Sequence, residues 1–276
     1  MPPRESWRRY EKLTTIPNVF PRASLCPAAP IHIIIYTRAR GQPRYGIFSY
    51  LRGRMRHDMH FPPTPDTDGT EALLRQVKQD LRSMMNGPVS QSLRQKGLRY
   101  KVNFGVELPR LQDYAATLPH TYTLAAALWK EDIRECRLLA GMLMPREEFP
   151  DDLADLWAEQ IRFPEEADST VFHLLQHLPY ASEKAFRWMA AEQPLQRYLG
   201  FALLTRLFMR GLRLTTRDAQ EFLDHAATDL NAAGNANVRA AAYKALLRFM
   251  DFGIGEERMG QRVLDSITPH DNQPTA

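Results

Sequence analysis

Cysteine and long apolar runs are both scarce in this 276-residue sequence. Its two cysteines, Cys26 and Cys136, cannot build a disulfide framework, so we expect a reducing compartment, the cytoplasm. No apolar run approaches the ~20 residues that a membrane-spanning helix needs. The longest run, residues 31–36, is far too short and is poorly placed for a secretory signal. We therefore expect no membrane association.

Motifs for metal binding, phosphate binding and nucleophilic catalysis are also absent. The sequence has no glycine-rich phosphate loop and no nucleophile motif. His173 and His177 have the i, i+4 spacing that could bind a metal on a helix, but the nearby chain offers no third ligand. We expect neither a metal nor a cofactor.

Net positive charge is missing from most of the chain, although the whole chain carries +4. Residues 1–60 hold eleven Lys and Arg against three acids, a balance of +8, so residues 61–276 carry −4. The basic isoelectric point therefore belongs to the N-terminal segment. This distribution argues against a strongly cationic nucleic-acid-binding body, but it still allows a local basic face.

The N-terminal segment, residues 1–68, contains 10 of the 20 prolines and no helical period. We interpret it as a disordered or poorly ordered leader. A basic nucleic-acid-binding arm is one alternative. Another is an upstream start assignment, with translation beginning at Met55 or Met59. At the other end, residues 269–276 are expected to be a frayed tail.

From residue 69 to residue 268 the sequence reads almost entirely as helix. We expect about twelve helices joined by short turns, with no convincing strand pattern. The clearest helices are expected over residues 71–86, 195–209 and 235–250. Helix pairs recur roughly every 35–40 residues, which is the period of HEAT-like repeats. The predicted fold is all-α, a HEAT-like α–α superhelix (a solenoid of antiparallel helix pairs) with one concave face. A compact helical bundle is the alternative.

The stretch 99–144 carries several local signals. Pro109 suits the first turn of a helix, and Asp132 with Glu135 has the spacing of a helix N-terminal cap. A buried stripe at helical spacing is expected at Ile133, Cys136, Ala140 and Leu143. Three tryptophans on apolar stripes are expected in the core: Trp129, Trp157 and Trp188.

Several motifs in the same order carry a family resemblance. They are N-F-G-V-x-x-P-R-L at Asn103–Leu111, A-x-x-L-W at Ala125–Trp129, R-E-C-R-L-L-A at Arg134–Ala140 and the Trp157 helix Leu153–Ile161. Over about residues 70–267 the sequence resembles the DNA alkylation repair family, the HEAT-repeat DNA glycosylases of the AlkD type. The resemblance implies a solenoid whose concave face grips duplex DNA and an activity that excises N3- and N7-alkylated purines.

The resemblance also implies a mechanism. Such alkylated bases are cationic, so their glycosidic bond is already weak. A carboxylate near the sugar stabilises the oxocarbenium-like transition state and positions a water. Two tryptophans flank this carboxylate and contact the cationic nucleotide. Unlike most glycosylases, the family does not need to bury the base in a flipping pocket.

Two positions of the chemistry can be compared directly. Asp168 matches the family's carboxylate, while Pro164 stands where the first tryptophan is expected. Asp168 could instead be a solvated residue near a helix start, where acids are favoured by the helix dipole. The adjacent Glu165 and Glu166 favour that structural interpretation, because three neighbouring acids would repel phosphate.

The remaining positions concern contact with DNA. Tyr243 falls at the second tryptophan position, or Lys244 if the alignment slips by one residue. Arg197 matches a basic residue that contacts the backbone opposite the lesion, and Lys244 and Arg248 are further candidates for phosphate contacts. Each of these could equally be a solvated surface residue.

Two functions follow from this reading. One is a monomeric DNA alkylation repair protein that binds duplex DNA and excises alkylated purines, with Asp168 as its carboxylate. The other is a non-catalytic HEAT-like module that binds a protein or nucleic-acid partner. A positive stripe through Arg197, Lys244 and Arg248 would favour DNA, and an acidic or apolar groove would favour a protein partner.

Overall fold

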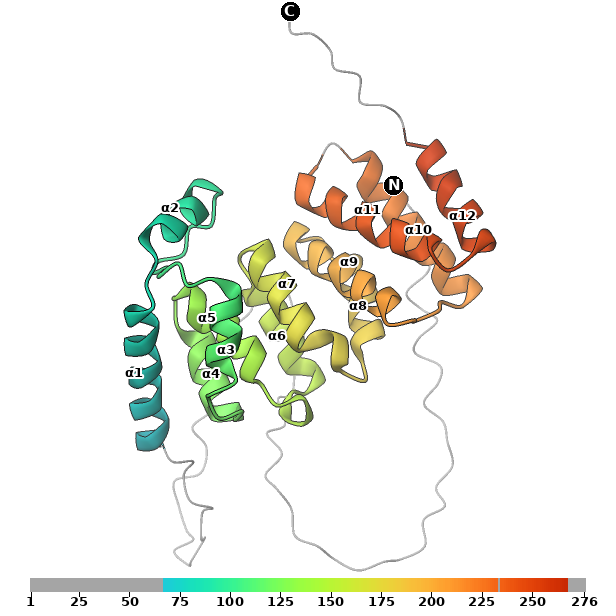
Figure 1. Ribbon diagram of the computed structural model, residues 1–276. Helices are drawn as coiled ribbons and strands as arrows, with labels where there is room; N and C mark the ends of the chain where they lie inside the picture. Colours follow the sequence, from blue (N-terminus) through green and yellow to red (C-terminus); the bar gives the residue numbers. More distant parts are fainter. Residues whose placement is uncertain (1–66, 233, 268–276) are drawn as a thin grey trace, which may run out of the picture. The chain divides into compact units, whose positions relative to one another are not determined.

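The computed structural model describes residues 67–232 and 234–267, and their regular structure is helical (Figure 1). The only bridge in these ranges joins Val102 and Ile133. The α-helices of the described ranges are α1 (Thr67–Ser83), α2 (Gly87–Gln95), α3 (Leu108–Ala115), α4 (Tyr122–Lys130), α5 (Arg134–Leu143), α6 (Asp151–Gln160), α7 (Pro164–His173), α8 (Ala181–Met189), α9 (Pro194–Met209), α10 (Thr216–Asn231), α11 (Ala236–Met250) and α12 (Ile254–Asp265). Two 3₁₀ turns are η2 (Arg146–Glu148) and η3 (Leu175–His177).

The all-α prediction is confirmed, and most helix ends follow the expected chemistry. Proline occupies the first turn of α3, α7 and α9, where its missing N–H costs nothing. The Thr215 hydroxyl caps α10 by accepting the Asp218 N–H at 3.2 Å. The leader and the tail are predicted over residues 1–68 and 269–276, which lie outside the described residues except for Thr67 and Asp68, where α1 begins. No described helix is long and apolar enough to cross a membrane.

The helices form two layers. In the inner layer α3, α5, α7, α9 and α11 pack in succession, each against the next. In the outer layer α4, α8 and α10 pack on α5, α9 and α11 respectively. Figure 1 shows these helices following one another in chain order from α3 to α12. This is the stacked-pair arrangement that the sequence predicts, and the successive inner helices place their side chains on a common face.

The repeat interval is shorter than predicted over the central helices. Contacts between successive repeats join Arg134 to Glu165, 31 residues later, and Arg137 to Glu166, 29 residues later. The interval is therefore about 30 residues rather than 35–40. The physical reason is helix length, since α5, α6 and α7 have 10 residues each, whereas α10 has 16.

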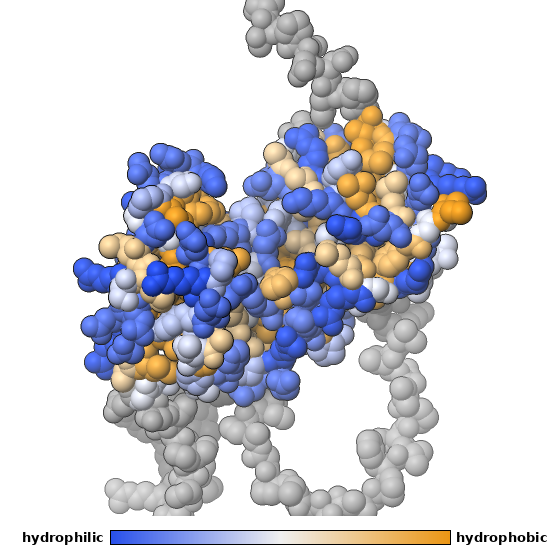
Figure 2. All heavy atoms as spheres, in the orientation of Figure 1, coloured by the Kyte–Doolittle hydropathy of each residue, from blue (hydrophilic) through white to orange (hydrophobic). Residues whose placement is uncertain are grey.

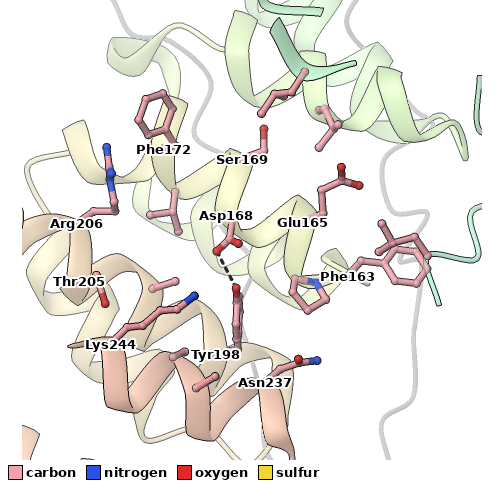
Figure 3. Close-up of a pocket in the computed structure, with 18 of the residues that line it drawn as sticks. Phe163, Glu165, Asp168, Ser169, Phe172, Tyr198, Thr205, Arg206, Asn237 and Lys244 are labelled. Atoms are coloured by element: carbon pink, nitrogen blue, oxygen red, sulfur yellow. Dashed lines mark hydrogen bonds between the residues drawn. The ribbon is translucent and has the colours of Figure 1, made fainter. Parts of the chain in front are cut away.

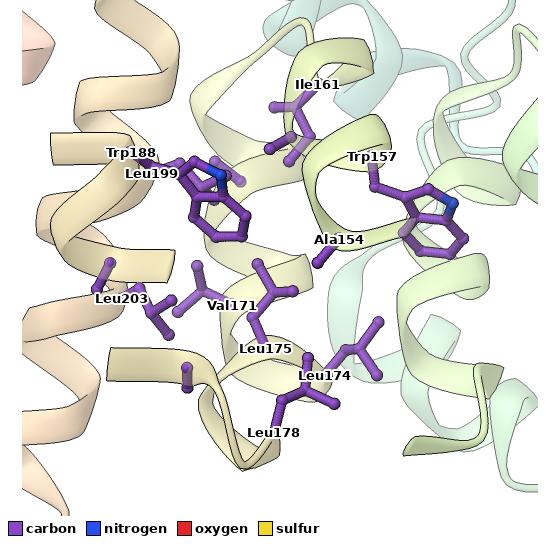
Figure 4. Packing of buried hydrophobic residues seen from close by; sticks show 14 of the residues in the cluster. Ala154, Trp157, Ile161, Val171, Leu174, Leu175, Leu178, Trp188, Leu199 and Leu203 are labelled. Atoms are coloured by element: carbon purple, nitrogen blue, oxygen red, sulfur yellow. The ribbon is translucent and has the colours of Figure 1, made fainter. Parts of the chain in front are cut away.

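The core confirms the expected placement of the tryptophans. Trp129, Trp157 and Trp188 are each only 3% exposed. The rings of Trp129 and Trp157 stack with centroids 3.9 Å apart. Figure 4 shows Trp157 and Trp188 among the aliphatic side chains that join α6, α7 and α9. These aromatic groups supply large buried areas between successive repeats and hold the inner helices in place.

The structure corrects the expected cap at Asp132 and Glu135. The residue before α5 is Ile133, and no side chain caps this helix. The fully buried Glu135 carboxylate instead accepts N–H groups from three successive residues of the preceding loop. They are Phe104 at 3.1 Å, Gly105 at 2.9 Å and Val106 at 3.2 Å. This explains why the N-F-G-V motif precedes the helix: its backbone is tied to Glu135.

Gly105 is required in this loop for two separate reasons. Its φ of 74° is left-handed, and a Cβ there would lie 2.2 Å from the Asn86 carbonyl oxygen. We expect Gly105→Ala to lower the free energy of unfolding by roughly 2–5 kcal/mol, the sum of backbone strain and overpacking. Gly211→Ala is the matched control, because Gly211 has a φ of 89° with nothing within 4 Å of its added Cβ. Equal losses for both variants in urea unfolding would contradict the assigned clash.

Candidate active site

A cavity of about 970 Å³ opens on the inner face of the helix stack. Its walls come from α7, α9 and α11 and, on the other side, from α3 and the end of α2. The charged groups that line it are Lys96, Glu165, Asp168, Arg206 and Lys244. The cavity therefore brings together Asp168 and Lys244, two of the residues selected from the sequence.

A hydrogen bond from Tyr198 holds Asp168 at the cavity. The Tyr198 hydroxyl on α9 donates a hydrogen bond of 2.8 Å to Asp168 Oδ1, and Lys244 extends toward the same carboxylate from α11 (Figure 3). The carboxylate faces solvent, but the cavity walls surround it, and this desolvation raises its pKa above the ordinary aspartate value. The Glu165 charge also raises the pKa, whereas the Tyr198 hydrogen bond and the Lys244 charge lower it.

The two glutamates beside Asp168 are neutralised by buried arginines. Arg134 Nε donates to Glu165 Oε2 at 2.9 Å, and Arg137 Nε donates to Glu166 Oε1 at 2.9 Å. Glu166 is 1% exposed and points away from the cavity. Within the described part of the chain, Asp168 is therefore the one acid of this segment without a guanidinium partner. The three acids do not form a repulsive patch in the cavity.

The other residues predicted to contact DNA are distributed differently. Lys244 lines the cavity, whereas Tyr243 does not and is 44% exposed on another side of α11. Arg197 Nε lies 3.1 Å from the Asp229 carboxylate, and its Nη1 donates to backbone carbonyls. Arg248 lines a smaller adjacent pocket and pairs with Asp251 at 3.0 Å. Of the three stripe cations, only Lys244 has no ion-pair partner among residues 67–232 and 234–267.

Sequence reasoning missed three residues that shape the cavity: Tyr198, Phe172 and Arg206. Tyr198 lies 30 residues after Asp168, one repeat interval, so the shorter interval would have placed them side by side. Arg206 packs over the Phe172 ring with its guanidinium carbon 4.6 Å from the centroid. With Phe163, which also lines the cavity, these residues give it an aromatic wall although Pro164 replaces the expected tryptophan.

The histidine pair does not form a metal site in the described residues. His177 Nδ1 lies 2.8 Å from Arg210 Nη1, and His173 Nε2 lies 3.5 Å from Gln112 Nε2. Among residues 67–232 and 234–267, no three or more His, Cys, Asp or Glu side chains are grouped to hold a metal ion. His177 therefore joins η3 to the end of α9, and His173 joins α7 to α3.

The Tyr198 hydrogen bond is expected to control the ionisation of Asp168. Tyr198→Phe removes a donor that stabilises the carboxylate, so the pKa of Asp168 should rise further. Glu165→Gln should shift it in the opposite direction, because it removes a negative charge. Both shifts can be followed by ¹³C NMR titration of the Asp168 carboxyl carbon. An unchanged pKa in Tyr198→Phe would show that the hydrogen bond does not form in solution.

The comparisons with known proteins agree with this architecture. The family model described as DNA alkylation repair enzyme matches residues 77–246. No match is found among curated proteins. A similar solved structure is described as "A new family of proteins related to the HEAT-like repeat DNA glycosylases with affinity for branched DNA structures". It is 15% identical, with a TM-score of 0.63, and the match covers 74% of this chain and 88% of that chain.

The structural match shows the fold, whereas the family match shows the family. At 15% identity the structural likeness shows the fold alone, and it confirms the predicted HEAT-like arrangement. The family match extends over more than half of the 276 residues and includes the cavity helices α7 and α9 and most of α11. The chain therefore belongs to the DNA alkylation repair enzyme family.

Proposed function

We propose that the protein binds duplex DNA and hydrolyses the glycosidic bond of N3- or N7-alkylated purines, with Asp168 as the catalytic carboxylate. The observation that carries the proposal is the setting of Asp168 in the inner-face cavity. It is held by Tyr198, lies near Lys244 and, within the described residues, has no guanidinium partner. Family membership supports the same reaction class.

The Asp168 carboxylate can stabilise the positive charge that develops on the sugar during this reaction. An alkylated purine carries positive charge, so the base is a good leaving group and needs little protonation. As the bond breaks, positive charge moves to the sugar, and a nearby anion in a desolvated cavity stabilises it. Asp168 Oδ1 accepts the Tyr198 hydrogen bond, whereas Oδ2 accepts none from the described residues and can face the sugar or a water.

The remaining cavity groups suit a cationic nucleotide in a DNA backbone. Lys96 and Lys244 can neutralise phosphates beside the lesion. Phe172 and Tyr198 offer aromatic surface to the positive base, the task that tryptophans perform in the family pattern. We also propose a cytoplasmic monomer that needs no cofactor. Within the described residues Cys136 is buried and free, which fits a reducing compartment.

Release of 7-methylguanine from a defined duplex tests this function. The full chain should release the base under single-turnover conditions, and an identical duplex with unmodified guanine should remain intact. Binding to both duplexes should weaken steeply with salt, because phosphate contacts release counterions. Binding without release would overturn the proposed chemistry and leave a DNA-binding protein.

A second function, a non-catalytic module for a protein partner, is favoured by one observation. A pocket of about 600 Å³ beside the cavity combines the apolar side chains of Met209, Leu247 and Met250 with charged side chains such as those of Arg248 and Glu257. Met209 is 54% exposed, and Ile254 on the neighbouring α12 is 68% exposed. Figure 2 shows apolar areas among the hydrophilic side chains over these C-terminal helices. Failure of both release and duplex binding would favour this function.

A further inference from the structure

Beyond Asp168, a cluster of cations lies at the η3 end of the α7–α9 groove. Tyr198 and Arg206 lie on α9, and Arg210 is the residue that follows the end of this helix. Each meets a partner on the α7 side: Asp168 at 2.8 Å, the Phe172 ring at 4.6 Å and His177 at 2.8 Å. The contact between Tyr198 and Asp168 belongs to the carboxylate site. The contacts of Arg206 and Arg210 place their guanidinium groups on the His177 side of the groove.

Three arginines act electrostatically on this histidine, and Arg210 contacts it directly. Burial lowers the pKa of His177, and the charges of Arg146 on η2, Arg210 and Arg206 lower it further. The Phe172 carbonyl acts in the opposite direction by accepting a hydrogen bond from the ring. His173 is the neighbouring titratable group, and its own pKa is lowered by burial and by His177. Burial and the neighbouring positive charges thus both disfavour the imidazolium form of His177.

Carboxylates do not neutralise this cluster in the described residues. Arg146, Arg206 and Arg210 take part in no ion pair within residues 67–232 and 234–267. Arg206 is only half-exposed and is held over Phe172, with its Nε 3.4 Å from Gln176 Oε1. Arg210 is exposed and is held by His177. Arginines that are positioned by neutral partners present their remaining donors to an external anion.

We infer that the cluster of Arg146, His177, Arg206 and Arg210 is a binding site for a phosphodiester group of the DNA backbone, separate from the carboxylate site. This inference rests on the proposed function for the source of the phosphate. Arg210, just past the end of α9, is 12 residues after Tyr198, or about 18 Å along the helix axis. The site therefore grips the backbone at a distance from the lesion and fixes the direction in which the strand crosses α7 and α9.

The test is the salt dependence of binding to an undamaged duplex. Arg210→Gln and Arg146→Gln in the full chain should each weaken binding about tenfold at low salt. Each should also reduce the slope of log affinity against log salt by roughly one. Arg258→Gln is the matched control, because it removes the same charge from an exposed position on α12. It should change the slope far less.

The imidazole of His177 gives an independent readout. A bound phosphodiester favours the imidazolium, so the pKa of His177 measured by NMR should rise when the duplex is added. Duplex affinity should then increase as the pH falls through that range, and His177→Gln should abolish this gain. His173→Gln should retain it. Inorganic phosphate at millimolar concentration is the comparison ligand and should produce a smaller shift than the duplex.

The outcomes separate the two proposals. Duplex binding with the same salt slope in Arg210→Gln and Arg258→Gln would overturn the phosphate site and leave the carboxylate site standing. A His177 shift with inorganic phosphate as large as that with duplex would overturn the assignment to DNA. Absence of any duplex binding would remove both proposals together.

Discussion

Asp168→Asn is expected to slow release of 7-methylguanine by roughly 100- to 1,000-fold, the loss typical when one group that stabilises transition-state charge is removed. The asparagine can still accept the Tyr198 hydrogen bond, so the cavity should keep its shape. Affinity for the duplex should stay equal or increase, because a negative charge near phosphate disappears. Single-turnover rates and fluorescence anisotropy measure the two effects separately.

The same variant should not destabilise the protein. The cavity walls around Asp168 desolvate its carboxylate and raise its pKa, so the ionised form is slightly disfavoured in the folded state, an effect that the solvent exposure of this residue keeps small. The resulting loss of stability is present above the folded pKa and disappears as the pH falls below the unfolded value. Asp168→Asn should therefore have an equal or higher melting temperature at pH 7. A lower melting temperature together with slow release would identify Asp168 as a structural residue.

Arg137→Ala is expected to have the largest effect on stability, a loss of about 3–5 kcal/mol in the free energy of unfolding. The Arg137 guanidinium is buried and donates to Glu166, to the Trp129 carbonyl at 3.0 Å and to the Gln160 carbonyl at 2.7 Å. It also lies 4.0 Å from the Trp129 ring centroid. Its removal leaves the Glu166 carboxylate buried without its principal partner and opens a gap between α5 and α7.

Two comparisons make this prediction specific. Arg248→Ala breaks an exposed pair with Asp251 and should change stability by less than about 1 kcal/mol. Adding Glu166→Gln to Arg137→Ala should recover part of the loss, because it removes the uncompensated charge. Urea unfolding of the full chain gives all three values. Equal effects of Arg137→Ala and Arg248→Ala would contradict the role of the buried pair.

The helices could be predicted because their causes are local. Pro109, Pro164 and Pro194 stand at helix starts, and apolar residues at helical spacing form the buried stripes. The role of Glu135 could not be predicted, since D-x-x-E spacing also fits a helix cap. Only the three-dimensional structure shows that the carboxylate accepts N–H groups about 30 residues earlier in the chain.

The candidate site was only partly accessible from the sequence for the same reason. Asp168 followed from a motif, but whether it faced the cavity depended on which of three neighbouring acids met Arg134 and Arg137. Arg197 matched a motif as well, yet Asp229 on α10 engages its guanidinium. Such pairings depend on the register between repeats. Because the predicted repeat interval was a few residues too long, it did not place Tyr198 beside Asp168.

The claim that the Asp168 carboxylate stabilises a cationic sugar can be tested most directly by binding, without turnover. We would measure the affinity of the full chain for a duplex with a pyrrolidine-type abasic analogue, which is cationic, against one with a neutral tetrahydrofuran abasic site. The account predicts at least tenfold tighter binding of the cationic analogue, and loss of this preference in Asp168→Asn. Equal affinity for the two duplexes in the unaltered protein would contradict it.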